Sequence, residues 1–179
     1  MSGRRKCIQI PKNVDVTLEG NIIEIIGPVG LLNRTIPNSV LVSVDNDVIK
    51  IGPKDKKSKK SKSLTGLMSK EIFNSIQAVV KKIEYCLELR GVGYRAQVKE
   101  NVLELFLGYS HPNSIKIIPQ IEVSVEGNTK ILIKGIEKAK IGLLASQIRY
   151  LRPPEPYKGK GIFYKGENII LKPGKSGKK

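Results

Sequence analysis

Hydrophobic and polar residues alternate along several short stretches of the chain. In one of them, Tyr85, Leu87 and Leu89 are separated by single polar or small residues, which is the period of a half-buried strand. The same alternation continues in three later stretches, 103–107, 121–125 and 131–133. We expect each of these to form a strand with one face in a core.

In two other places the period changes to that of a helix. Apolar residues at the spacing of one helix face are Ile141, Leu144, Ala145, Ile148 and Leu151. Pro153 is expected to end this helix, because proline cannot continue one. The equivalent stripe in the first half is Met68, Ile72, Ile76, Val79 and Ile83. Strands grouped apart from helices predict an α+β fold rather than parallel βαβ units.

The chain contains an internal repeat. Asn21–Ile25 matches Asn101–Leu105 at an offset of 80 positions, and Val42–Asp45 matches Val123–Glu126 at an offset of 81. We therefore predict two tandem copies of a small domain, each with antiparallel β-sheets and one α-helix around a single core. The predicted boundaries are 1–82 for the first copy, 83–152 for the second, and 153–179 for an extended basic C-terminal arm.

The predicted arm combines proline, glycine and lysine. Three prolines between Arg152 and Tyr157 fix φ and remove backbone donors. Lys158 and Lys160 then alternate with glycines, which allow a partner to approach the backbone closely. Such an arm suits a phosphate backbone better than a small-molecule pocket. We expect both globular halves to remain folded when 153–179 is removed.

The charge of the chain indicates a polyanionic partner. The formal net charge is +16 and the pI is near 9.9. Nucleic acid is the first candidate, and an anionic membrane surface is the second. A membrane partner would need a basic amphipathic helix or an apolar span, and neither is found. Six lysines in the insert 54–62 repel one another and would stay disordered unless counter-charged; they face either nucleic acid or water.

Little in the sequence supports catalysis, a metal site or a cofactor. Cys7 and Cys86 are too isolated for a zinc site or a disulfide framework and are expected to be reduced. His111 is the only histidine, which removes most histidine-based acid–base and metal chemistry. The Gly91–Gly93 pair has no third glycine that opens a helix, so it predicts a bend between strands rather than a dinucleotide site. We predict no enzyme activity and no cofactor.

The aromatic content indicates how nucleic acid would be bound. The chain has no tryptophan, and no stretch matches the stacking motifs of single-strand readers. This favours recognition of folded RNA by shape, through phosphates and 2′-hydroxyls. Tyr94, Tyr109 and Tyr157 are either stacking residues or members of the small cores.

Four stretches carry a family resemblance: 91–96, 107–112, 134–138 and 152–161. Together with 10–14 and 27–30, they resemble the signature segments of the bacterial-type ribosomal protein L6 family of the large subunit, in the same order. The resemblance implies a duplicated fold that binds large-subunit rRNA directly, chiefly through the second copy and the C-terminal extension. It implies a place near the sarcin–ricin loop and the landing site of the translational GTPases, beside other large-subunit proteins.

The resemblance and the charge together select candidate rRNA-binding residues. They are Tyr94, Arg95, Ser110, His111, Lys138, Arg149, Arg152, Tyr157, Lys158, Lys160, Lys165, Lys172, Lys175, Lys178 and Lys179. The first half departs from the family pattern at 2–5, at 64–66 and in the lysine-rich insert. The expected location is the ribosome of a bacterial cytoplasm or a plastid stroma, without a membrane. Two rival interpretations remain. One is a free nucleic-acid chaperone or RNA-modification accessory protein, and the other is an enzyme, for which His111 would be the first residue to test.

Overall fold

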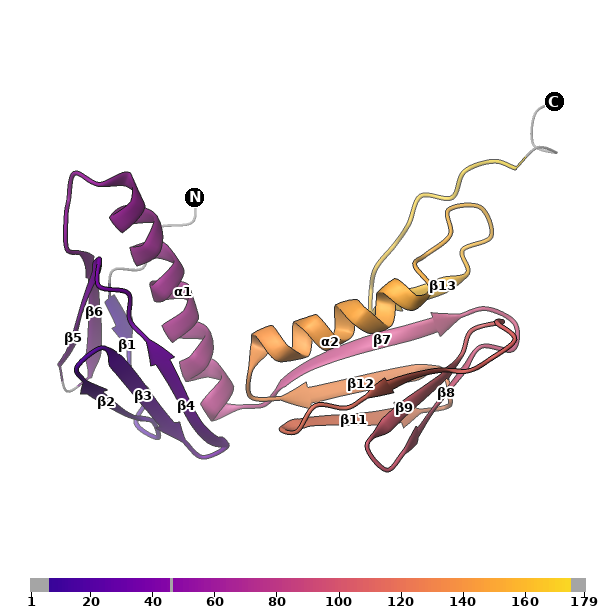
Figure 1. The fold of residues 1–179 in the computed structure, drawn as a ribbon, viewed down its shortest axis with the longest axis horizontal. Coiled ribbons are helices and arrows are strands. Elements are labelled where there is room, and N and C mark those ends of the chain that lie inside the picture. Colours follow the sequence, from indigo (N-terminus) through magenta and orange to yellow (C-terminus); the bar gives the residue numbers. More distant parts are fainter. Residues whose placement is uncertain (1–6, 46, 175–179) are drawn as a thin grey trace. The chain divides into compact units, whose positions relative to one another are not determined.

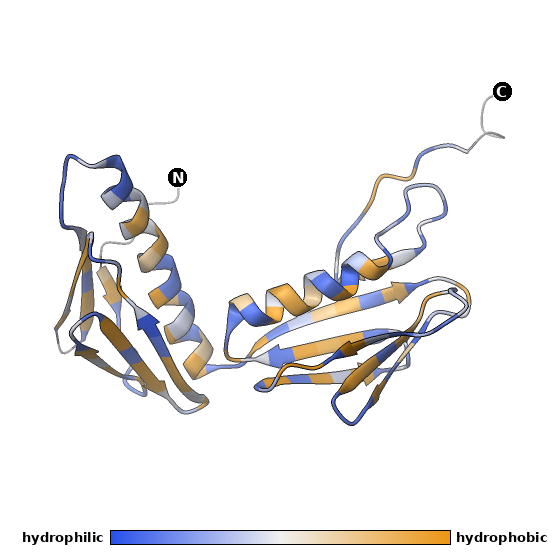
Figure 2. Cartoon of the chain, in the orientation of Figure 1, coloured by the Kyte–Doolittle hydropathy of each residue, from blue (hydrophilic) through white to orange (hydrophobic). Residues whose placement is uncertain are grey.

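A computed structural model describes residues 7–45 and 47–174, and they fold into two compact units (Figure 1). The first unit comprises 1–82 together with 136–138, and the second comprises 83–135 together with 139–179. Both units combine antiparallel sheets with one helix, so the predicted α+β class is confirmed. Hydrophobic and hydrophilic residues alternate along the strands and around the helices (Figure 2).

The first unit has two three-stranded antiparallel sheets and a long helix. The sheets have the orders β1-β6-β5 and β2-β3-β4. The elements are β1 (Cys7–Gln9), β2 (Asp15–Glu19), β3 (Ile22–Gly27), β4 (Gly30–Thr35), β5 (Val40–Asp45), β6 (Val48–Pro53) and α1 (Lys59–Val80). Their apolar faces meet in one core, in which Ile23, Ile49 and Ile72 are fully buried.

The second unit repeats this plan with one additional strand. Its sheets have the orders β11-β12-β7-β13 and β10-β9-β8. The elements are β7 (Ile83–Arg90), β8 (Arg95–Lys99), β9 (Val102–Phe106), β10 (Asn113–Lys116), β11 (Ile121–Glu126), β12 (Lys130–Gly135), α2 (Lys138–Leu151) and β13 (Gly161–Tyr164). Leu87, Leu105 and Ile148 belong to its single core.

The duplication extends to individual backbone hydrogen bonds. The first matched stretch of the repeat falls on β3 and β9, and the second falls on β5 and β11. The amide of Ile36 donates to the carbonyl of Asn21 at 2.7 Å, and that of Ile117 donates to Asn101 at 2.8 Å. The two acceptors are offset by 80 positions and the two donors by 81, so the bonds are equivalent in the two copies. The repeat is therefore one architecture built twice.

The helix patterns are confirmed apart from their ends. Ile141, Leu144, Ala145 and Ile148 are buried on α2, and Met68, Ile72, Ile76 and Val79 are buried on α1. Ile83, which we expected to be the last position of the first stripe, instead begins β7, because α1 ends at Val80. Among the described residues no helix is both long and apolar enough to cross a membrane.

The lysine-rich insert has local structure at its end. Ser58 caps α1, and its hydroxyl accepts a hydrogen bond from the amide of Ser61 at 3.4 Å. The helix begins at Lys59, so the last part of the insert is its first turn. No acidic residue lies in that turn, although the positive end of a helix dipole favours one.

The segment expected to be an extended arm is partly folded into the second unit. Gly161–Tyr164 forms β13 and pairs antiparallel with β7, with Phe163 opposite Glu88. Ile162 is 0% exposed and Phe163 is 1% exposed. The prolines before this strand lie in a closed loop, described below. The expectation that 153–179 can be removed without unfolding a unit therefore has to be revised, since part of this range lies in a core.

Candidate nucleic-acid interface

Tyr94 packs against two glycine-containing turns, at Gly91 and at Gly108. Its side chain is only 8% exposed and belongs to the core of the second unit. A Cβ added at Gly91 would lie 2.8 Å from its ring, and one added at Gly108 would lie 3.5 Å away. Gly91 therefore leaves room for this ring, whereas a side chain at Gly108 would only make ordinary contact with it. In this structure Tyr94 positions the turns and offers no ring face for a base.

Arg152 lies over the exposed tyrosine of the second turn. Its guanidinium carbon is 5.0 Å from the ring centroid of Tyr109, which is 48% exposed. The Tyr109 hydroxyl donates to the carbonyl of Leu151 at 3.1 Å. The pKa of Arg152 is raised above its ordinary value, chiefly by a hydrogen bond with Tyr109 and further by the neighbouring Tyr94. Arg152 is thus a fixed cation. Tyr109, which was predicted to be a stacking or core residue but not an rRNA-binding residue, belongs to this site.

Ser110 and His111 follow Tyr109 in an exposed bend. Gly108 begins this bend with φ of +76°, a conformation that glycine adopts without strain. The bend presents a hydroxyl and an imidazole to solvent close in sequence to the ring beneath Arg152. These side chains can donate to or accept from phosphates and 2′-hydroxyls.

The proline-rich run forms a closed loop instead of an extended arm. The amide of Glu155 donates to the carbonyl of Lys160 at 2.8 Å, and the amide of Gly159 donates to Glu155 at 3.1 Å. At the base of the loop, the amide of Ile162 donates to the carbonyl of Arg152 at 2.9 Å. Gly161 is required there, because a Cβ would lie 2.7 Å from the Pro153 carbonyl oxygen.

Cations and one aromatic ring lie on this loop. Tyr157 is 57% exposed, Lys158 is exposed, and Lys160 is half-buried. The following chain returns to the loop, where the amide of Lys172 donates to the carbonyl of Pro156 at 2.8 Å. The loop and the tail therefore form one basic surface, which we call the loop–tail surface (Lys158, Lys160 and Lys172).

Arg149 has an internal partner that sequence reasoning missed. Its guanidinium donates to Glu167 at 2.6 Å and lies 5.6 Å from the ring centroid of Tyr164. The second oxygen of Glu167 accepts from the amide of Tyr164 at 3.0 Å. Arg149 therefore joins α2 to the turn after β13. Its Nε is buried and has no hydrogen-bond partner among the described residues.

This ion pair predicts a pH-dependent contribution to stability. The pKa of Glu167 lies below its ordinary value of 4.5, mainly because of the Tyr164 amide and also because of Arg149. Its contribution is present above about pH 4.5 and is lost as the pH falls through the lower folded pKa. We expect Glu167→Gln to lower the free energy of unfolding at pH 7 by about 1–2 kcal/mol. Denaturant melts from pH 7 to pH 3 should show this difference shrinking.

The exposed Glu19→Gln, which removes the same charge from the first unit, is the matched control. It should cause no comparable loss at pH 7. A Glu167→Gln loss that stayed constant down to pH 3 would show that the carboxylate charge is not responsible.

The remaining candidates are not among the three lysines that define the loop–tail surface. Arg95 is exposed and stacks on Phe106, with 4.2 Å from guanidinium carbon to ring centroid. Lys138 is exposed at the start of α2, and Lys165 is exposed directly after β13. The last three candidates, Lys175, Lys178 and Lys179, lie outside the described residues.

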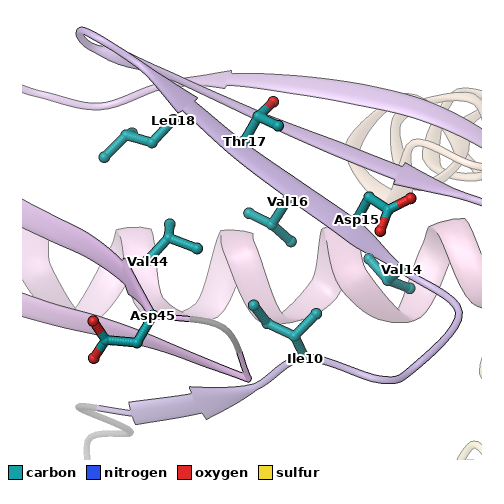
Figure 3. Close-up of a pocket in the computed structure, with 8 residues that line it drawn as sticks. All are labelled: Ile10, Val14, Asp15, Val16, Thr17, Leu18, Val44 and Asp45. Atoms are coloured by element: carbon teal, nitrogen blue, oxygen red, sulfur yellow. The ribbon is translucent and has the colours of Figure 1, made fainter.

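A groove of the first unit has no lysine or arginine among its described lining residues. This groove, of about 660 Å³, is lined mainly by aliphatic side chains, with Asp15 and Asp45 among the lining residues. Ile10, Val16 and Val44 point toward one another within it (Figure 3). Within 7–45 and 47–174, no group of three His, Cys, Asp or Glu residues could hold a metal ion. The cations on the second unit are therefore the candidate interface.

Comparison with known proteins identifies the family. The family model described as Ribosomal protein L6 matches residues 90–165. The large ribosomal subunit protein uL6 of Halalkalibacterium halodurans is 46% identical over 176 residues, which cover 97% of each chain. This chain belongs to the uL6 family. The uL6 protein of Geotalea daltonii is 44% identical over 96% of each chain, and uL6c of Cyanophora paradoxa is 43% identical over 98% of this chain and 97% of its own.

The family match covers much of the candidate interface. The matched residues, 90–165 of this chain, include the turns at Gly91 and Gly108, all of α2, the proline-rich loop and β13. The resemblance to the L6 family is thereby confirmed. The names of these uL6 relatives denote ribosomal proteins and not enzymes.

Proposed function

We propose that this chain is a structural, non-catalytic constituent of the large ribosomal subunit and binds large-subunit rRNA directly. The observation that carries the proposal is similarity to uL6 proteins over nearly the whole length of both chains. The net charge of +16 supports an RNA partner, because cations neutralise phosphates when RNA is drawn together. Relatives from bacteria and from Cyanophora paradoxa agree with a bacterial or a plastid ribosome.

We assign rRNA binding chiefly to the second unit. The loop–tail surface would contact phosphates, and Arg152 on the ring of Tyr109 would present a planar donor to RNA. The closed loop is held by its own backbone hydrogen bonds, so it loses less conformational entropy on binding than a free chain would. Arg149 and Tyr94 would support this surface from beneath. A place near the sarcin–ricin loop and the translational GTPases, beside other large-subunit proteins, completes the proposal.

Sedimentation of a cell lysate through sucrose tests the proposal. We expect the tagged full-length chain to migrate with the large subunit at low salt and to remain there after a high-salt wash. Free chain at the top of the gradient at both salt concentrations would contradict the proposal. Binding of many unrelated RNAs with equal affinity, without comigration, would instead support a free RNA chaperone.

A further inference from the structure

The two units differ at one edge of one sheet. In the second unit, β7 lies between β12 and β13. In the first unit, β1 takes the place of β7 and pairs with β6, but it is the end of its sheet. Within 7–45 and 47–174, no strand occupies the position beside β1 that corresponds to β13. In the part of the chain that the structure describes, the fourth strand position of this sheet is occupied in the second unit and open in the first.

In the second unit, the additional strand completes the core. Ile162 belongs to the core cluster that also contains Leu89 and Ile148. Phe163, on the other side of the strand, is also buried, and the guanidinium of Arg90 lies 4.5 Å from its ring centroid. A strand at this position thus gains both backbone hydrogen bonds and apolar burial.

Two residues of β1 direct their backbone N–H and C=O groups away from the neighbouring strand β6. The amide of Ile10 donates to the carbonyl of Asp47 at 2.9 Å, so Ile10 faces β6. The backbone N–H and C=O groups of successive residues in a strand point alternately to the two neighbouring strand positions. Those of Ile8 therefore also point toward β6, and those of Cys7 and Gln9 point outward. The second unit has the same arrangement, in which the outward carbonyl of Cys86 accepts from the amide of Lys165 at 2.9 Å.

An open apolar pocket lies beside this outer edge. It has a volume of about 670 Å³, and its lining residues are Cys7, Ile8, Gln9, Ile10, Pro11, Val48 and Phe73. Phe73 comes from α1 and is only half-buried. The ammonium of Lys70 lies 5.3 Å from its ring centroid, which adds a cation near the pocket. The edge thus offers backbone donors and acceptors, apolar surface and positive charge together.

We propose that the outer edge of β1 accepts an extended segment of another protein, which adds antiparallel to Cys7–Gln9 as a fourth strand. The segment places a large apolar side chain in the pocket, as β13 contributes Ile162 to the second unit. Lys70 favours a segment with an acidic residue. Pro11 has no amide hydrogen, so pairing ends there. That the partner is a neighbouring large-subunit protein rests on the proposed function.

Hydrogen exchange of the full-length chain tests the proposal, comparing the free protein with the protein in purified large subunits. The outward amides of Cys7 and Gln9 should exchange at least about tenfold more slowly in the subunit. Gln9→Pro removes the outward amide while leaving the bonds to β6, because edge strands tolerate proline facing outward. Gln9→Ala is the matched control. The slowing should persist in Gln9→Ala and disappear in Gln9→Pro, while the two variants melt alike.

Three results would overturn the proposal. Slow exchange of the outward amides of Cys7 and Gln9 in the free chain would mean that the edge is already paired. Unchanged rapid exchange in the subunit would mean that no strand adds. Equal slowing in Gln9→Pro and Gln9→Ala would mean that RNA covers this surface without strand pairing.

A peptide titration separates failure of this proposal from failure of the proposed function. The probe is a synthetic peptide that repeats residues 160–165 with glutamate in place of both terminal lysines. If the chain does not enter the large subunit, this peptide should still shift the amide resonances of Cys7 and Gln9 in the full-length protein. It should not shift the amide resonance of Cys7 in Gln9→Pro. No shift in the wild-type protein would then overturn the proposed edge site.

Discussion

Truncation after Arg152 is expected to unfold the second unit. The deletion removes β13, and with it Ile162 and Phe163, which are 0% and 1% exposed. Burial of each large apolar side chain contributes about 1.5–3 kcal/mol. The truncation also removes Glu167, the partner of Arg149. The combined loss of about 5 kcal/mol approaches the whole stability of a small domain, which is typically about 5–15 kcal/mol.

The matched control is a truncation after Glu167, which keeps β13 and the Arg149 ion pair. This shorter deletion removes residues 168–179, and we expect both units to melt cooperatively near the wild-type temperature. Amide spectra of the two truncated proteins would separate the outcomes, because only the deletion of 153–179 should collapse the resonances of the second unit. A native-like spectrum for that deletion would show that the core tolerates the loss of its fourth strand.

Much of the fold follows from local sequence patterns. The strand at 85–89 and the apolar stripe of α2 were predictable because their burial period is visible over five or more residues. The internal repeat then indicated that the first half has the same plan. Gly91–Gly93 was expected to form a bend, and it lies in the turn between β7 and β8.

The strand β13 could not be predicted in the same way. Gly161–Tyr164 has only four residues, and it follows a run of proline, glycine and lysine that indicated an irregular arm. Its formation depends on a free edge of β7, which is more than 70 positions earlier in the chain. Because the pairing partner is distant in the sequence, the pairing leaves no recognisable alternation of hydrophobic and polar residues in the short strand itself. The same limit hides the outer edge of β1, which becomes visible only when the two sheets are compared.

The candidate interface was predictable in composition but not in the roles of its members. Charge and the family resemblance selected Tyr94, Arg149 and Arg152 together. The structure gives them different surroundings: Tyr94 is buried, Arg149 is paired with Glu167, and Arg152 lies over Tyr109. Sequence alone does not tell whether an aromatic ring faces a core or a base. It also does not indicate which carboxylate, here 18 positions away, will pair with an arginine.

Neutralising the loop–tail surface is expected to weaken rRNA binding and make it less dependent on salt. The triple variant Lys158→Gln, Lys160→Gln and Lys172→Gln removes three cations whose backbone is fixed by the closed loop and the returning tail. Each phosphate contact contributes about 0.7–0.9 to the slope of log affinity against log salt, so the slope should fall by about 2–3. Affinity should fall about 10- to 100-fold, since exposed charge pairs contribute up to about 1 kcal/mol each.

Titration of full-length protein with a large-subunit rRNA fragment that contains the sarcin–ricin loop, at 50 to 200 mM salt, measures both quantities. A second triple variant, in which Lys12, Lys116 and Lys130 are replaced by Gln, removes the same charge from exposed positions that belong neither to the loop nor to the tail. If phosphates are bound at the loop–tail surface, the slope of log affinity against log salt should fall in the first variant and stay close to the wild-type slope in the second. Equal losses in both variants would mean that binding follows the total charge of the chain, and the closed loop would then have no special part in recognising RNA.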